Sequence, residues 1–411
     1  AARLQFCSGN LYLCLHRLAG RPHHEKLLIL RECKDQLPDH LEFVDHGHDV
    51  KKHRYATGIT PGPNTVRYSS NLPSLLIPLQ TFIPYGAIKY QRTEEPQMKI
   101  LIIGGTRFQG KYLINHLLEQ NYDITVFHRG LHPLSPRTKI TEVLGDRNEK
   151  KDLQTIPHAD YDWLVDTCAY SPIQCKLVSR VLGSHLNKIC FISTTYVYKT
   201  LFPKVDELSF LKDPISDTTI NHQTYGALKG MCEQEYLSLG KDKVLILRPS
   251  VIVGHGDHTG RLDFWLRLSK TMNRQLQVGT SLNKQFSVID VRDLTNFTAN
   301  ALRIQLTGIF NVSGRAIRLS EILAFFTRKH SQERNLTLTT QQLNLLGIEK
   351  SHLPYLMTEE DEEFNSQKAS GKGLVTRSIE ETLRDFSQEA SNFILPSFYT
   401  DIINSIANSF I

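Results

Sequence analysis

The stretch Met98–Gly130, MKILIIGGTRFQGKYLINHLLEQNYDITVFHRG, decides the fold, because it is the most regular segment of the 411-residue sequence. It opens with the apolar run KILII, which is typical of a strand buried on both faces of a parallel sheet. The next segment, KYLINHLLEQ, places Leu113, Leu117 and Leu118 on one face of a helix. YDITVF then has the pattern of a second strand.

Further strands are predicted at DWLVDTCA, KICFIS and KVLILRPS, each separated by a helical or long segment. This alternation predicts an α/β fold, with a Rossmann-type doubly wound parallel sheet and a smaller C-terminal α/β substrate domain. We expect a dinucleotide-binding domain over residues 98–250, and a substrate-binding and C-terminal region over 251–411 that is interleaved with the first. Residues 1–97 show no sustained period and many prolines, which predicts a poorly ordered N-terminal extension.

A glycine-rich turn, GGTRFQG, connects the first strand to the first helix. Such a turn can hold the pyrophosphate of a dinucleotide against backbone N–H groups and the positive end of the helix. Gly104 would permit the tight turn and Gly110 the close packing of helix on strand, while Arg107 replaces the middle glycine of the usual pattern. The predicted cofactor-binding residues of this loop are Gly104, Gly105, Arg107, Phe108 and Gly110.

The end of the second strand indicates which dinucleotide is bound. A carboxylate there would bind both ribose hydroxyls of NAD, but this chain has His128 and Arg129. Because a guanidinium can pair with a 2′-phosphate through two hydrogen bonds, NADP is favoured over NAD. Asp146 of LGDR is a candidate partner for the adenine amino group, although an aspartate is also common in turns without a ligand.

A candidate proton-transfer group follows the strand KICFIS. Thr194 ends that strand, and Tyr225 and Lys229 of YGALK lie four residues apart, on one face of a predicted helix. A nearby ammonium favours the phenolate of a tyrosine, which is otherwise a weak base at neutral pH. The similar pentapeptide YGAIK at Tyr85 precedes the glycine loop and lacks this context, so we interpret it as incidental.

In their order, these motifs resemble the extended, NAD-dependent epimerase/dehydratase branch of the short-chain dehydrogenase/reductase superfamily. The resemblance covers residues 98 to about 330 and also includes LRPSVIVGHGD, FSVIDVRDL and GIFNVSG. It implies that Thr194, Tyr225 and Lys229 are catalytic, and that Thr167, Ala169 and Pro249 lie along the cofactor. The superfamily's additional upstream asparagine has no match in VDTCAYSP.

The resemblance also bears on the reaction. At this strand end, sugar 4,6-dehydratases have a sequence similar to STDEVYG, in which the acidic pair eliminates water. This chain has Thr195 and Tyr196 in place of the acidic pair, which disfavours dehydration. An epimerase or a reductase of a carbonyl or sugar-nucleotide substrate remains. We expect the substrate pocket near Thr195, Ile252, Gly254, Arg261, Trp265 and Arg292. Both arginines could bind a diphosphate or could equally be salt-bridge partners.

The loop GGxxxxG is similar to the loop of an atypical subgroup of the superfamily, which includes chloroplast stem-loop RNA-binding proteins. The alternatives are therefore an RNA-binding protein, or an NADP-binding redox sensor without turnover, on the same fold. Charge gives a polyanion partner little support, because 12 basic and 9 acidic residues precede Met98, and 36 and 33 follow from it, a balance of +3 in each part. The acidic stretch TEEDEEF, at residues 358–364, is expected to be a solvated face or loop.

Composition bounds the remaining properties. Seven scattered cysteines without a Cys-x-x-Cys pair argue against a disulfide framework, and no metal site is predicted. No apolar run reaches the roughly 18–20 residues that span a bilayer, so we expect no membrane partner and a cytoplasmic location. By resemblance alone, a homodimer is expected.

Overall fold

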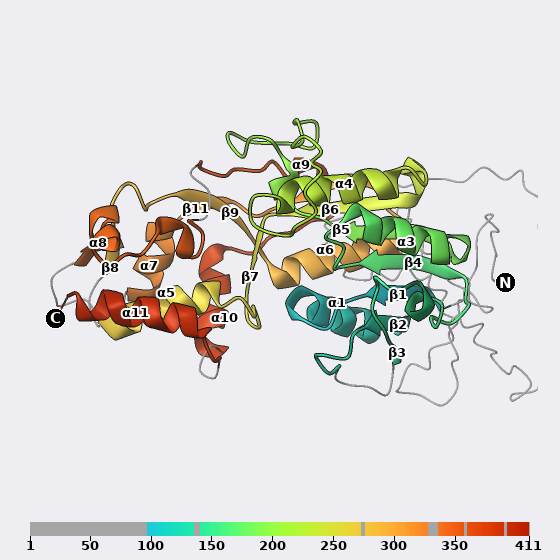
Figure 1. Cartoon of the computed structure of the whole chain (residues 1–411), viewed down its shortest axis with the longest axis horizontal. Helices are drawn as coiled ribbons and strands as arrows, with labels where there is room; N and C mark the ends of the chain where they lie inside the picture. The colour runs from blue at the N-terminus through green and yellow to red at the C-terminus, as the bar shows by residue number, and fades with distance from the viewer. Residues whose placement is uncertain are drawn as a thin grey trace, which may run out of the picture. The chain divides into compact units, whose positions relative to one another are not determined.

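The computed structural model describes residues 97–134, 140–272, 276–327, 336–356, 360–389 and 393–410 (Figure 1). All of them belong to one compact unit, Glu94–Ile411. The predicted N-terminal extension therefore lies, except for its last residue, outside the described residues.

A seven-stranded parallel sheet forms the larger part of this unit, with the strand order β10-β6-β5-β4-β1-β2-β3. The order runs outward in both directions from β1, which confirms the predicted doubly wound α/β fold. The strands are β1 (Lys99–Ile103), β2 (Asp123–His128), β3 (Ile140–Leu144), β4 (Tyr161–Asp166), β5 (Leu186–Ile192), β6 (Val244–Pro249) and β10 (Gly308–Val312).

Helices cover both faces of this sheet. Successive side chains of a strand point to opposite faces, so Ile100 and Ile102 pack on one side of β1, with α1 and α6, while Leu101 and Ile103 pack on the other, with α3 and α4. This two-sided burial is why β1 is apolar throughout. The helices of this part are α1 (Phe108–Glu119), α2 (Lys150–Leu153), α3 (Pro172–Leu182), α4 (Tyr225–Leu237) and α6 (Val291–Arg303).

A second core is built from the C-terminal part of the chain. A three-stranded sheet has the order β11-β9-β7, in which β7 is parallel to β9 and β11 is antiparallel to it, and β8 pairs with β12 in a separate ladder. The strands are β7 (Val251–Val253), β8 (Leu276–Val278), β9 (Gln285–Asp290), β11 (Ala316–Arg318) and β12 (Leu336–Leu338). The helices are α5 (Arg261–Met272), α7 (Leu319–Thr327), α8 (Thr340–Leu345), α10 (Ile379–Glu389) and α11 (Ser397–Asn408), whereas α9 (Gln367–Ser370) packs against β10 of the large sheet.

The chain passes more than once between these two parts. After β9, α6 packs beside α1 and β10 adds an edge strand to the large sheet, before β11 returns to the small one. The residues beyond 250 thus contribute to both the large sheet and the C-terminal core. The predicted domain boundary at residue 250 stays a prediction. Short 3₁₀ turns complete the fold: η2 (Gly183–His185), η3 (Thr195–Val197), η4 (Lys241–Lys243) and η5 (Lys350–His352). In the described ranges, no helix is both long and apolar enough to traverse a bilayer.

Candidate functional site

The glycine loop has the backbone geometry of a ligand cradle. Gly104 and Gly105 have φ values of +86° and +80°, which side-chain-bearing residues rarely adopt. A β-carbon on Gly104 would lie 2.6 Å from Oγ1 of Thr167, and one on Gly110 would overlap the backbone of Gly105. The N-cap residue Arg107 makes no side-chain capping hydrogen bond, and the N–H of Gly110 bonds to the carbonyl of Arg107 at 2.9 Å, so among the described residues the N–H groups of Phe108 and Gln109 are the ones available to an anion.

Thr167 locks the loop from the neighbouring strand. Its hydroxyl donates to the carbonyl of Ile103 at 3.0 Å and accepts from the N–H of Gly105 at 2.9 Å. The residues predicted here, Phe108 included, are thus brought together at the carboxyl ends of β1 and β4. Phe108 is buried with φ of +34°, while the Arg107 side chain is exposed.

The two predicted cofactor-binding residues at the end of β2, His128 and Arg129, have different environments, and Arg129 is the one predicted to pair with a 2′-phosphate. His128 is buried, with Nε2 2.8 Å from Oε1 of Glu142 on β3 and Nδ1 accepting from the N–H of Gly130 at 3.1 Å. Both ring nitrogens are thus engaged, which argues against a direct phosphate contact for His128. Arg129 is exposed beside it, and its guanidinium has no partner in the described part of the chain.

A buried ion pair that the sequence analysis missed lies behind the loop. Asp146 forms a turn, its Oδ1 accepting from the N–H of Asn148 at 2.8 Å, and the next residue, Arg147, enters the interior. Arg147 binds both carboxylate oxygens of Asp166, at 2.6 and 2.8 Å, and Tyr236 donates to the same carboxylate at 2.5 Å. Burial raises the pKa of Asp166, but the charge and hydrogen bonds of Arg147, together with those from Tyr236 and the N–H of Cys168, hold that pKa below its ordinary value. A basic residue in LGDR was the only sequence signal for this pair.

Thr194 and Tyr225 meet where β5 ends and α4 begins. Thr194 caps η3, its hydroxyl accepting from the N–H of Tyr196 at 3.2 Å. A β-carbon on Gly226 would overlap the carbonyl oxygen of Tyr196, so η3 lies directly against the first turn of α4. Burial and then Tyr170 raise the pKa of Tyr225, whereas a hydrogen bond with the Thr194 hydroxyl and the charge of Arg261 lower it. The predicted hydroxyl pair is therefore assembled, together with Arg261.

Lys229 lies beneath this pair, with 2% of its surface exposed. Its ammonium donates to the carbonyls of Ile192, at 2.7 Å, and Ala169, at 3.0 Å, and lies 4.1 Å from the centre of the Phe191 ring. Burial lowers the pKa of Lys229, against the opposing effects of Cys232 and Asp166. An ammonium has three N–H donors, so these two carbonyls leave one for another group. Ala169, predicted as a cofactor residue, thus contributes through its carbonyl to holding Lys229.

The predicted substrate residues have mixed positions. Arg261 is half-buried, with Nε 2.9 Å from Oδ2 of Asp257 and Nη2 donating to the carbonyl of Ile252 at 2.9 Å. Gly254 has φ of +141°, and a β-carbon there would lie 2.8 Å from Val291.

Other predicted residues lie in the interior. Thr195 is only 1% exposed. Pro249 ends β6, in register with Val312 of β10. Trp265 is fully buried in the C-terminal core, its indole N–H donating to the carbonyl of Pro354, which corrects its expected place in a pocket.

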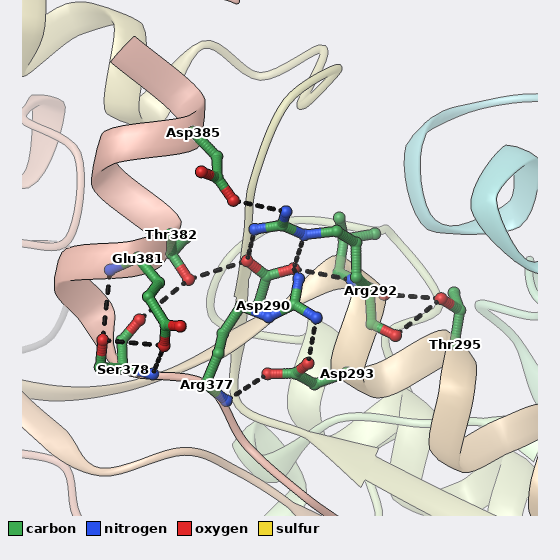
Figure 2. A network of polar contacts seen from close by, with 10 residues as sticks. Asp290, Arg292, Asp293, Thr295, Arg377, Ser378, Glu381, Thr382 and Asp385 are labelled. Carbon is green, nitrogen blue, oxygen red and sulfur yellow. Dashed lines mark hydrogen bonds and ion pairs between the residues drawn. The ribbon is translucent and has the colours of Figure 1, made fainter. Parts of the chain in front are cut away.

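Arg292 belongs to an ion-pair network rather than to the Tyr225 group (Figure 2). Its guanidinium binds Asp290 at 2.7 Å and Asp385 at 2.7 Å, while Arg377 binds Asp290 and Asp293 at 3.3 and 3.0 Å. Of the two roles considered for Arg292, the structure shows the salt bridge. The reason is local: Asp290 caps α6, which places its carboxylate beside the side chain two residues later.

The acidic stretch at residues 358–364 also differs from expectation. Glu362 is 2% exposed and Phe364 6% exposed, so part of a segment predicted to be solvated is buried. Glu362 binds Lys284 at 2.9 Å, a pairing across 78 residues that the local charge pattern gave no means of predicting.

Taken together, a doubly wound sheet, a glycine cradle at the end of β1 and a Thr–Tyr pair beyond β5 define a dinucleotide-binding protein of the Rossmann class. Comparison with known proteins assigns the family. The model of the "NAD dependent epimerase/dehydratase family" matches residues 100–313, which is more than half of the chain, and the chain belongs to this family. NAD(P) is the cofactor of the family, and the cradle formed by Gly104, Gly105 and Gly110 fits its pyrophosphate.

One curated relative is the chloroplast stem-loop binding protein of 41 kDa b of Arabidopsis thaliana, which is 25% identical over 248 residues. The match covers 56% of this chain and 62% of the relative, so the chain spans less than two thirds of the relative's length.

Solved structures share the fold. UDP-glucose 4-epimerase from Thermotoga maritima has 16% identity and a TM-score of 0.56, over 71% of this chain and 98% of that one. dTDP-glucose 4,6-dehydratase from Bacillus anthracis, in complex with NAD, has 15% identity and a TM-score of 0.56, over 71% and 96%.

Proposed function

We propose that this protein is an NAD(P)-dependent epimerase or reductase that acts on a small carbonyl or sugar-nucleotide substrate. The observation that carries the proposal is that Thr194 and Tyr225 come together where β5 ends and α4 begins, with Lys229 buried one turn further along α4 and the glycine cradle at the carboxyl end of the same sheet. In this role Tyr225 gives or takes the proton of the substrate oxygen, and Thr194 holds that oxygen in place.

Lys229 acts through its charge. Its two main-chain acceptors hold the ammonium one helical turn after Tyr225 on α4, and in the proposed role its positive charge favours the phenolate. The third N–H would be available to a ribose hydroxyl of the cofactor. Bound in the cradle, NAD(P) supplies the hydride acceptor and donor of the reaction.

NADP is the favoured cofactor because of Arg129. Its exposed guanidinium follows β2 and has no partner among the described residues, so it suits a 2′-phosphate. Gly104, Gly105 and Gly110 would hold the pyrophosphate, and Asp146 would lie near the adenine.

Fluorescence titration of the full chain with NADPH and NADH tests the cofactor. We expect NADPH to bind at least several-fold more tightly, and Arg129→Ala to remove that preference. If neither nucleotide binds, the enzyme proposal fails.

Turnover tests the proton donor. We expect Tyr225→Phe to lower hydride transfer on carbonyl and sugar-nucleotide panels by about 10²-fold or more, because general acid–base catalysis contributes about 10²–10⁴-fold. Tyr161→Phe is the matched control, since that hydroxyl contacts Thr125 and Pro157 away from the site. NADPH binding without any Tyr225-dependent turnover would favour the redox sensor.

RNA binding is the second candidate, and the name of the Arabidopsis relative is the observation that favours it. A stem-loop RNA should then bind with an affinity that falls steeply with salt, because phosphate contacts release counterions.

That relative is named chloroplastic, and the cytoplasmic location and homodimer expected for this chain are predictions that fractionation and light scattering can test.

A further inference from the structure

A buried three-residue contact joins the turn after β5 to the C-terminal part of the chain. The hydroxyl of Tyr196 donates to the carboxylate of Glu362, with distances of 3.1 and 3.3 Å to its two oxygens. The ammonium of Lys284 donates to Oε1 of the same carboxylate at 2.9 Å. The side chains of Glu362 and Lys284 are only 2% and 3% exposed. Burying charges is costly unless they are paired and hydrogen-bonded, as they are in this group.

The contact lies beside the proposed proton donor. Tyr196 follows Thr194 by two residues, and its carbonyl oxygen touches the position that a β-carbon of Gly226 would take. The same position lies 3.0 Å from Nζ of Lys212, whose pKa is lowered by burial and raised by Glu360 and Glu362. Polar groups, the carbonyl of Tyr196 and the ammonium of Lys212, therefore adjoin the first turn of α4.

The side chain of Tyr196 is only partly buried, and it lies within electrostatic range of the reacting group. The charge of Arg261 and the hydroxyl of Tyr225 both act on Tyr196, and Arg261 acts on Tyr225 in turn. Tyr196 thus connects the two groups: its hydroxyl donates to Glu362, and its backbone N–H donates to the hydroxyl of Thr194. Because its single proton is donated to Glu362, its oxygen can only accept a further hydrogen bond.

A purely structural role explains this arrangement less well. Lys284 and Glu362 already neutralise each other, and a buried ion pair is often no more stabilising than apolar residues of similar volume. The added phenol is not needed for that neutrality, whereas its bond to Glu362 fixes the orientation of an acceptor oxygen two residues after Thr194.

We propose that Tyr196 is a specificity-determining residue that accepts a hydrogen bond from a substrate hydroxyl, and that Glu362 and Lys284 are positioning residues that orient its oxygen. The inference rests on the proposed function and narrows it. A substrate without a hydroxyl at this point leaves the acceptor unpaired, and sites built in this way reject such analogues strongly.

Calorimetry on the full chain saturated with NADPH tests the inference through coupling between two hydroxyls. The ligands are UDP-glucose, UDP-galactose and dTDP-glucose, each with its monodeoxy sugar analogues. We expect one deoxy analogue to bind the parent at least about tenfold more weakly. The same analogue should lose less than about twofold in Tyr196→Phe, because the protein hydroxyl is already absent.

Tyr161→Phe is the matched control and should retain the parent's discrimination. Glu362→Gln should weaken the discrimination without abolishing NADPH binding, and if that variant does not fold, Tyr196→Phe decides alone. Equal losses for all analogues in the parent and in Tyr196→Phe would overturn the inference. So would the absence of binding by any of the three sugar nucleotides, while bound NADPH and Tyr225-dependent turnover of a simple carbonyl would leave the proposed function standing.

Discussion

Two arginine–aspartate groups, one in each part of the molecule, differ in how many partners each charge has. In the sheet region, Arg147 and Asp166 form a closed pair whose side chains are 8% and 0% exposed. In the C-terminal region, Asp290 accepts from Arg292, Arg377 and the hydroxyl of Thr382, and Arg292 is 33% exposed (Figure 2). The first group depends on a single cation, whereas the second is shared.

This difference in the number of partners predicts how well each region tolerates an amino-acid substitution. A buried carboxylate with one cation has no substitute when that cation is removed, because water cannot reach it. Asp290 is also buried, but its carboxylate is shared by two partly exposed arginines and the hydroxyl of Thr382, so it keeps other donors when one arginine is removed. We therefore expect the residues behind the cofactor cradle to be less tolerant of substitution than those that join α6 to α10.

The largest effect is expected for Arg147→Met, which leaves Asp166 buried with only Tyr236 and the N–H of Cys168 as donors. Removing one partner of a buried pair typically costs about 3–5 kcal/mol. Chemical denaturation with urea measures the free energy of unfolding. A cost below about 1 kcal/mol would show that water or another group compensates Asp166.

The pH dependence of the same variant sharpens the test. In the parent, the lowered pKa of Asp166 adds stability above its unfolded pKa of about 4, and this stability is lost as pH falls through the folded value. Without Arg147, burial is opposed only by the hydrogen bonds from Tyr236 and the N–H of Cys168, so we expect the pKa of Asp166 to rise above its unfolded value and the variant to lose stability as pH rises. The difference in unfolding free energy between parent and variant should therefore be larger at pH 7 than at pH 4.

Much of the sheet region could be predicted because its signals are local. The apolar run of β1, the spacing of Leu113, Leu117 and Leu118, and the glycines of the loop each act through neighbours in the chain. The order of Thr194, Tyr225 and Lys229 likewise follows from strand and helix succession. The Arg147–Asp166 pair escaped prediction because it joins residues 19 apart on different elements.

The C-terminal contribution could not be predicted in this way. Tyr196 and Glu362 are 166 residues apart, and a run of acidic residues gives no sign of which carboxylate is buried. Only the folded chain brings Glu362 to Lys284 and Tyr196. Arg292 shows the converse, since a charge that could have served a substrate is instead used by Asp290 and Asp385.

An intermediate effect is expected for Gly226→Ala, because the new methyl group would overlap the carbonyl oxygen of Tyr196. Overpacking of this kind costs about 1–3 kcal/mol and should displace η3 from α4. Gly230→Ala, on the same helix, is the matched control, since its β-carbon would lie 4.0 Å from the nearest side-chain atom, on Val197. Alanine there should be neutral or stabilising by up to about 1 kcal/mol. Equal thermal stability of the two variants would show that α4 can shift without cost.

The smallest effect is expected for Arg292→Met, because Asp290 keeps Arg377, Thr382 and the N–H of residue 292 as donors. A partly exposed pair contributes about 0–1 kcal/mol, so this single change should cost no more than that in urea denaturation. The double variant with Arg377→Met removes both cations, and its cost should exceed the sum of the two single costs by about 1 kcal/mol. This excess free energy measures how far the two arginines share Asp290, because either one can still pair with that carboxylate when the other is removed. Additive costs would mean that the cations act on Asp290 independently, and the contrast with the Arg147–Asp166 pair would then be one of burial alone.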